Sequence, residues 1–231
     1  MSFQAQVNLQ PAPAVEGDFA SANPRAVMLA GEGTLVTGAS GVTVGRFAWA
    51  DANGVVNNYY TVGGRNGFIH REQQAVITVF LDETSNLVPA GLPVTLYVQG
   101  EFWGKFAGGA TIGQKVYASY ADGTLSAAAT GTPPTNTGTV STATDTTLTV
   151  TTAPAAPIVV GQPVSGSGIP AGAYIAALGT GTGGLGTYTL SAATTATASG
   201  VTATFTTAKE TNFNVDSTAA AGELAKISTW G

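Results

Sequence analysis

The sequence contains no cysteine and a single histidine, His70. Without cysteine the chain forms no disulfide bond, has no thiol nucleophile and offers no thiolate to a metal. Charged residues make up only 9% of the 231 residues, against roughly 25% in an ordinary globular protein. A surface with so few charges is weakly hydrated, which favours permanent burial against neighbouring proteins over life as a free monomer.

The few cations do not gather in one place. Eight Lys and Arg residues against 13 Asp and Glu residues give a net charge of −5, and the cations are scattered singly along the chain. Because nucleic-acid binding needs a basic patch, we expect no nucleic-acid partner. The sequence also lacks an apolar run of about 18 residues and a basic N-terminal stretch followed by an apolar one. We therefore expect neither a membrane span nor a signal peptide.

The abundant residues favour β-structure. Glycine occurs 31 times, threonine is common and strong helix formers are scarce, which is typical of an all-β chain with many tight turns. Side chains alternate in size or polarity over residues 47–49 and 94–98, as they do in half-buried strands. Asn53-Gly54 lies between two apolar runs and predicts a type I′ β-hairpin.

Residues 123–208 carry one charged residue, Asp145, and consist mainly of Thr, Ala, Gly, Ser, Val and Pro. Sequence of ordinary mixed polarity precedes and follows this stretch, which predicts a small β-domain inserted into a host domain. The Gly and Pro residues at 131–134 mark its beginning. We expect a host β-barrel or β-sandwich formed by residues 26–132 and 207–231, with residues 133–206 forming an inserted β-sandwich near the lower size limit for such a domain.

The first 25 residues predict an extended segment rather than a helix, because Pro11, Pro13 and Pro24 fix φ and remove backbone donors. Two interpretations stay open. The segment is a terminal tail without fixed structure, or it is an arm that lies across a partner and becomes ordered there. The candidate partner-binding residues of the arm are Phe3, Val7, Leu9, Pro11, Pro13, Val15 and Phe19.

No catalytic or cofactor motif has the context that its chemistry requires. His70 has Glu72 near it but no nucleophile elbow elsewhere in the sequence, so we interpret it as a surface or interface histidine. Residues 181–186 match G-x-G-x-x-G, but strand-like sequence follows where a pyrophosphate site needs a helix, which favours a glycine-rich turn. The acidic pairs lack calcium-loop spacing. We expect no enzyme activity, no metal and no cofactor.

The large aromatic residues of the host domain favour a core over a sugar-binding platform. Phe102 and Trp103 are adjacent, so on a strand they face opposite sides and one of them is exposed or covered by another subunit. The candidate residues for an interface between copies of the chain are Phe102, Trp103 and Trp230.

Several segments resemble the structural cement proteins, or head decoration proteins, of tailed phages. Residues 10–25 (QPAPAVEGDFASANPR) resemble the start of these proteins, and residues 221–230 (AGELAKISTW) resemble their closing segment. Phe47-Ala48-Trp49 and residues 67–71 (GFIHR) are similar to host-domain motifs of the family. Residues 166–172 (GSGIPAG) and 186–191 (GTYTLS) resemble a β-module, of an Ig-like kind, that recurs in phage virion proteins.

The resemblance implies a non-enzymatic virion protein that binds the outer surface of the capsid and bridges neighbouring capsid subunits. The implied partners are the major capsid protein and further copies of the chain, with a homotrimer favoured over a dimer. Assembly would take place in the cytoplasm of the host cell. The alternative function is adhesion, with the inserted domain presented on the virion surface as a glycan-binding module.

Overall fold

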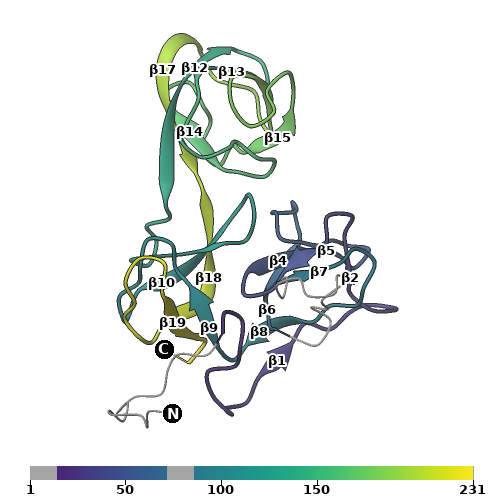
Figure 1. The fold of residues 1–231 in the computed structure, drawn as a ribbon. Coiled ribbons are helices and arrows are strands. Elements are labelled where there is room, and N and C mark those ends of the chain that lie inside the picture. Colours follow the sequence, from purple (N-terminus) through teal and green to yellow (C-terminus); the bar gives the residue numbers. More distant parts are fainter. Residues whose placement is uncertain (1–14, 72–85, 231) are drawn as a thin grey trace, which may run out of the picture.

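The structure is a computed structural model that describes residues 15–71 and 86–230 (Figure 1). Every regular element in this described part of the chain is a β-strand, so the prediction of an all-β fold is confirmed. In the lower part of Figure 1 the strands form two large sheets, of six and five strands, and a short two-stranded pair. A separate six-stranded sheet lies at the top.

The first large sheet is built from early segments of the chain. Its strand order is β1 (Ala26–Val27), β8 (Leu96–Gln99), β6 (Arg65–Ile69), β4 (Phe47–Ala50), β5 (Val55–Asn57) and β2 (Val36–Thr37). All neighbours are antiparallel except β2 and β5. A short antiparallel pair accompanies this sheet, formed by β3 (Val42–Thr43) and β7 (Leu87–Val88).

The second large sheet combines segments from before and after residues 133–206. Its strand order is β11 (Leu125–Ala128), β10 (Lys115–Ser119), β18 (Ala208–Val215), β19 (Leu224–Ser228) and β9 (Glu101–Lys105). The chain just after β9 forms a bridge from Phe106 to Leu125 of β11, which draws the two edges of the sheet together. The C-terminal strands therefore complete a sheet that the first half of the chain begins.

The main core lies between these two sheets. Phe47 and Trp49 of β4 belong to one cluster with Phe102 of β9 and Phe213 of β18. On the opposite face of β4, Ala48 and Ala50 belong to a second cluster of apolar side chains. All four residues of β4 are buried, so this strand is covered on both faces and is the centre of the host domain.

The turn between β4 and β5 differs from the predicted type I′ turn. Gly54 has φ +81°, but Asn53 is not among the described residues with positive φ, and a type I′ turn needs both. The Asp51 side chain accepts hydrogen bonds from the backbone N–H groups of Asn53 (2.9 Å) and Val55 (2.8 Å). Asp51 therefore favours a longer loop in which only the glycine takes the left-handed conformation.

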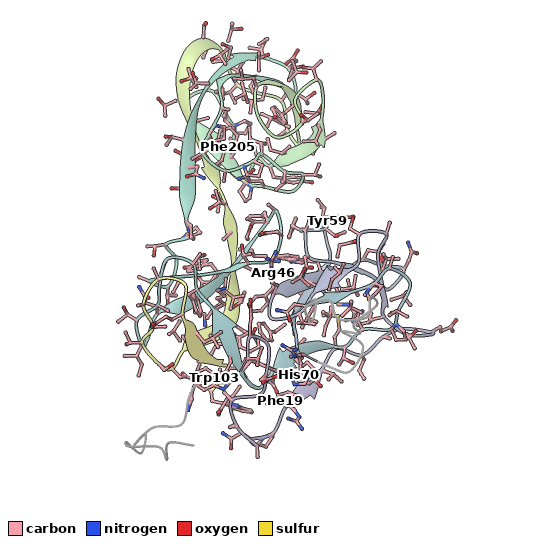
Figure 2. The ribbon with its side chains drawn as sticks, in the orientation of Figure 1. Phe19, Arg46, Tyr59, His70, Trp103 and Phe205 are labelled. Carbon is pink, nitrogen blue, oxygen red and sulfur yellow. The ribbon has the colours of Figure 1, made fainter. Side chains whose placement is uncertain are left out.

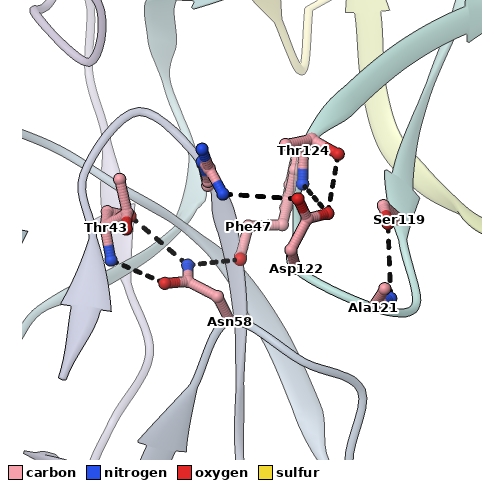
Figure 3. Close-up of polar contacts among 8 residues, drawn as sticks. Thr43, Phe47, Asn58, Ser119, Ala121, Asp122 and Thr124 are labelled. Carbon is pink, nitrogen blue, oxygen red and sulfur yellow. Dashed lines mark hydrogen bonds and ion pairs between the residues drawn. The ribbon is translucent and has the colours of Figure 1, made fainter. Parts of the chain in front are cut away.

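Polar side chains hold together the segments before β4 and after β5, and an ion pair links them to the β10–β11 turn (Figure 3). The amide of Asn58 donates to the backbone oxygen of Phe47 over 3.0 Å, and its oxygen accepts from the N–H of Thr43 over 2.6 Å. Arg46 forms an ion pair with Asp122 at 3.4 Å. Both charged side chains are partly exposed, so the pair contributes at most about 1 kcal/mol. The turn is held mainly by backbone hydrogen bonds, such as Phe47 N–H donating to Gly123 O over 2.9 Å, and by packing.

The sheet at the top of Figure 1 has its own core and curls until its edges meet. Its strand order is β14 (Val164–Gly166), β17 (Thr197–Thr206), β12 (Thr135–Ala143), β13 (Thr147–Thr152), β16 (Gly186–Leu190) and β15 (Ile175–Leu178). The edges are joined by Val164 N–H donating to Ala173 O (3.0 Å) and Ile175 N–H donating to Gln162 O (2.9 Å). The unit, which we call the small barrel, is therefore a small, closed β-structure made from one curled sheet, in keeping with the predicted small β-domain.

The chain enters and leaves the small barrel at one place. Thr207 N–H donates to Pro134 O over 2.8 Å, and β17 runs on directly into β18 of the second large sheet. Glu210 on β18 accepts from the Tyr117 hydroxyl (2.7 Å) and from Gly131 N–H (2.8 Å), which fixes the entering strand. The barrel thus lies between residues 133 and 206, while its independent folding, and that of the host domain, stays a prediction.

Candidate functional site at the N-terminal junction

The predicted arm is only partly described by the structure. Val15 and Phe19 lie in the described part, with Val15 50% exposed and Phe19 half-buried. The other candidate partner-binding residues lie outside the described residues, and they are Phe3, Val7, Leu9, Pro11 and Pro13. The site that can be built from coordinates is therefore residues 15–20, which we call the arm root.

The arm root extends the second large sheet beyond β9. Gly17 N–H donates to Trp103 O (2.8 Å), Trp103 N–H donates to Asp18 O (2.9 Å), and Phe19 forms an antiparallel bridge with Phe102. The root is also bonded to the first large sheet, because Arg71 N–H, which follows β6, donates to Gly17 O over 3.0 Å. A pull on the preceding residues is thus transmitted to both sheets of the host domain.

Gly17 is required for this close approach. Its φ is +88°, a conformation that only glycine adopts without strain. A Cβ at this position would lie 3.0 Å from the backbone nitrogen of Gly45 and 3.3 Å from that of Arg71. Gly45 also has no room for a side chain, because a Cβ added to it would lie 2.4 Å from Cγ of Glu16.

Phe19 holds the root to the host domain through ring contacts (Figure 2). Its ring stacks on His70 with a centroid distance of 3.7 Å and an interplanar angle of 15°. The guanidinium carbon of Arg25 lies 3.8 Å from the Phe19 centroid. Because two groups this close to one centroid cannot share a face, they cover opposite faces. Phe19 also contacts Phe102 in the core, at 5.4 Å between centroids.

His70 is a neutral packing residue at this junction. Burial disfavours the charged imidazolium and lowers the pKa of His70 to about 4, while Asp18 raises it and Arg25 lowers it further. Its Nδ1 is buried and has no hydrogen-bond partner among the described residues. The ring contacts of His70 are with Phe19, Tyr97 and Phe102. These surroundings favour a structural role and leave the triad chemistry without support.

Hollows flank the Glu16 side chain. One of about 520 Å³ is lined by Val15, Glu16, Lys105 and neighbouring residues, and a smaller one of about 290 Å³ by Glu16, Arg46 and Lys105 among others. Burial raises the pKa of the Glu16 carboxyl, and the opposing effects of Lys105 and Arg46 are smaller. Lys105 and Arg46 therefore offset part of the free-energy cost of burying this carboxylate, although neither forms an ion pair with it in the described structure.

The candidate residues for an interface between copies are not equivalent. Phe102 is fully buried in the core of the chain, so the expectation that it contacts another subunit is wrong. Its neighbour Trp103 points away from the core, half-buried, with the Lys226 ammonium 5.3 Å from its ring centroid. Trp230 is 53% exposed. Trp103 and Trp230 stay as candidates.

Other chemistry finds no site in the described residues. No three His, Asp or Glu side chains in residues 15–71 and 86–230 come together as a metal site requires. The glycine-rich residues 181–186 run directly into β16, as a turn does, rather than into a helix. Within residues 15–71 and 86–230, no helix has the length and apolar character needed to span a membrane.

Sequence reasoning missed most of this junction. The pairing of the arm root with β9 joins residues about 85 positions apart and has no local signal. The stacking of Phe19 on His70 joins residues 51 positions apart and has no local signal either. Gly17, placed between two acidic residues, was the available sign of a special backbone conformation.

Comparison with known proteins identifies the family. A family model described as XM1 gp53 minor capsid protein matches residues 3–161, which are 159 of the 231 residues. The match includes the N-terminal segment and β1 to β13, and it ends inside the small barrel. No curated protein matches the chain. The resemblance to capsid-associated phage proteins is thereby confirmed, and the chain belongs to the XM1 gp53 minor capsid protein family.

Proposed function

We propose that this protein binds the outer surface of the assembled phage shell and cements it, with the N-terminal arm bridging neighbouring capsid subunits. Membership of a minor capsid protein family makes the chain a structural component of the virion that associates with the capsid. The bridging role, the outer surface and the major capsid protein as direct partner are our inferences.

The arm root carries this proposal. Residues 15–20 are hydrogen-bonded to β9 in one sheet and to the end of β6 in the other, and Phe19 is clamped between His70 and Arg25. A terminal segment that only trails in solvent needs no such attachment. A segment that bears mechanical force needs this attachment, because a pull on one contact is then distributed over the core of the host domain.

The arrangement of the chain suggests an orientation on the shell. In Figure 1 the arm root lies at the opposite end of the molecule from the small barrel. If the arm holds the shell, the barrel points away from it. The alternative function, adhesion to a glycan, would then use a barrel that is well placed but whose binding stays a prediction.

Self-association would strengthen the attachment. Trp103 with Lys226, and Trp230, present exposed or half-exposed aromatic surface near the same end of the molecule. We propose that these residues join copies into a trimer around a symmetry axis of the shell. Three linked arms bind far more tightly than one, since the second and third contacts form at high effective concentration.

The test is co-sedimentation with purified shells that lack the protein. Deletion of residues 1–14 removes the arm but keeps its root, so the variant should unfold at the same temperature as the full chain and fail to occupy shells. Phe3→Ala with Leu9→Ala should reduce occupancy in the same direction. Equal occupancy by the deletion variant and the full chain would remove the arm from the mechanism.

A further inference from the structure

A groove of about 550 Å³ lies between the host domain and the small barrel. The host side contributes Tyr59, Tyr60 and Tyr120, and the barrel side contributes residues 157–160 and Leu178. No charged side chain lines the groove in the described part of the chain. Its volume is in the range of ligand pockets, roughly 300–1,000 Å³, but its lining suits an uncharged apolar occupant.

The floor of the groove is well supported. The Tyr60 ring lies edge-on to Tyr120, with centroids 4.8 Å apart, and to Trp49 at 5.7 Å. On the barrel side Gly161 lies against this ring, where a Cβ would be 2.3 Å from Tyr60 Cδ1. The host and barrel therefore meet at a fixed contact beneath the groove.

The rim of the groove exposes apolar surface. Tyr59 is 48%, Val62 51% and Leu178 45% exposed. These are three of the ten large apolar side chains that the described part of the chain exposes, and they line one groove. Such a concentration of apolar surface is typical of an interaction site.

The first ten residues of the chain match this surface in character. Apolar and polar residues alternate without a break, with Met1, Phe3, Ala5, Val7 and Leu9 between Ser2, Gln4, Gln6, Asn8 and Gln10. A strict period of two is the pattern of an extended strand with one apolar face. The first charged side chain is Glu16, so the segment brings no charge into a groove that has none to pair with it.

The length of the segment allows it to reach another copy. Extended chain spans about 3.3 Å per residue, so Val7 can lie up to about 26 Å, and Phe3 up to about 40 Å, from the arm root. Phe19 in the root and Tyr59 at the groove lie at opposite ends of the host domain in Figure 2. Residue 15, where the described part of the chain begins, therefore lies near the end of the host domain away from its own groove.

We propose that residues 1–9 of one copy lie as an extended strand in the groove between host domain and barrel of a neighbouring copy. The apolar face, with Phe3, Val7 and Leu9, contacts the tyrosines and Leu178, and the Gln and Asn side chains face solvent. The inference rests on the proposed function in that the arm is the bridging element. It makes a second copy of this chain, in place of a capsid subunit, the partner of residues 1–9, so that bound copies form a network of their own over the shell.

The lack of cysteine makes disulfide trapping a direct test. One full-length chain carries Val7→Cys and a second carries Leu178→Cys, and the two are mixed, free in solution and bound to shells, and then oxidised mildly. The proposal predicts that the Val7→Cys and Leu178→Cys chains form a disulfide-linked heterodimer in a yield several-fold above that of two control pairs. One control pairs Val7→Cys with Leu29→Cys, since Leu29 is 80% exposed on the chain after β1. The other pairs Asn8→Cys, on the polar face, with Leu178→Cys.

Each outcome decides the matter. Equal heterodimer yields for Leu178 and Leu29, or for Val7 and Asn8, would mean that contact is random and would overturn the proposal. No heterodimer in either setting would also overturn it. A chain carrying both Val7→Cys and Leu178→Cys that closes on itself would replace the neighbour by the chain's own arm. Shell occupancy is measured separately, so loss of the groove contact with normal occupancy leaves the cement function standing.

Discussion

The contact between Phe19 and His70 gives a prediction that can be tested by measuring the pKa of one side chain, His70. The Phe19 ring covers His70 at 3.7 Å, and burial lowers the pKa of His70 to about 4 from an ordinary value near 6.5. Phe19→Ala opens the imidazole to water. The pKa of His70 should therefore rise towards about 6.5 in the variant.

The stability cost follows from the same contacts. Replacing a fully buried Phe by Ala costs about 3–5 kcal/mol, and Phe19 is only half-buried. Adding the loss of its stacking and cation–π contacts, we expect the free energy of unfolding to fall by about 2 kcal/mol at pH 7. Phe19→Leu keeps an apolar cover and should lose less.

The pH dependence has a definite sign. A lowered pKa means that the unfolded state binds more protons than the folded state between about pH 4 and 6.5. The contribution of His70 is therefore fully present above pH 6.5 and is lost as the pH falls towards 4. Because the imidazole is partly exposed, we discount this loss to the order of 1 kcal/mol. Phe19→Ala should abolish most of it.

The assay uses the single histidine, whose ring proton resonances need no assignment by mutagenesis. Wild type should titrate with a midpoint near 4 and Phe19→Ala with a midpoint above 5.5 (roughly one unit short of the ordinary value). Urea unfolding at pH 7 and pH 5 supplies the stabilities. An unchanged His70 midpoint in Phe19→Ala would refute the idea that the arm root covers this histidine.

Three further predictions concern the root and the barrel. Gly17→Ala should lower the free energy of unfolding by about 1–2 kcal/mol or more, since it places a Cβ at positive φ against backbone, whereas Gly31→Ala, with open space around it, should change it little in urea unfolding. Glu16→Gln should raise the melting temperature at pH 7 more than at pH 4. Because burial raises the pKa of Glu16, its carboxyl contributes stability that is full below pH 4.5 and is lost as the pH rises through the folded-state pKa. An equal effect at both pH values would contradict this. Gly161→Ala should separate host and barrel and speed proteolysis at residues 131–134 and 207, whereas Gly172→Ala, which has similar φ but no neighbour within 4 Å, should not.

Local patterns predicted the strands but not their layers. The alternation of Phe47 and Trp49 with alanines identified β4 and one buried face correctly. It could not show that Ala48 and Ala50 are buried as well, because that depends on Val42, Val44 and other residues of the second cluster packing on the far face. Similarly, adjacent Phe102 and Trp103 had to face opposite ways, and only the position of the sheet decides that Phe102 faces inward.

The charge-poor composition predicted a separate β-domain at residues 133–206, which stays a prediction, and the structure places one sheet between Thr135, where β12 begins, and Thr206, where β17 ends. The closure of that unit into one curled sheet was not visible in composition. Closure depends on pairing between the segments around Val164 and Ile175, and a two-sheet sandwich would have a similar count of strands and turns. The pattern of Thr and Gly constrains the strands, and the register between them decides the shape.

The candidate site was harder to foresee than the fold. The prolines and spaced apolar residues predicted an extended N-terminal segment, with a free tail and a partner-binding arm both left open. The candidate contacts from Phe3 to Pro13 lie outside the described residues. The structure adds the arm root, where Phe19 contacts His70 and Gly17 bonds to the residue that follows His70. These contacts join residues more than 50 positions apart in the sequence. Long-range contacts of this kind leave only single-residue traces in a sequence.

The most direct test of cementing is the temperature at which DNA-filled shells release their DNA. Shells lacking the protein are compared with shells saturated by the full chain and with shells exposed to the variant lacking residues 1–14. The account predicts that the full chain raises the release temperature by several degrees and that the arm-deleted variant does not. Shells occupied fully by the full chain that release DNA at the same temperature as bare shells would contradict it.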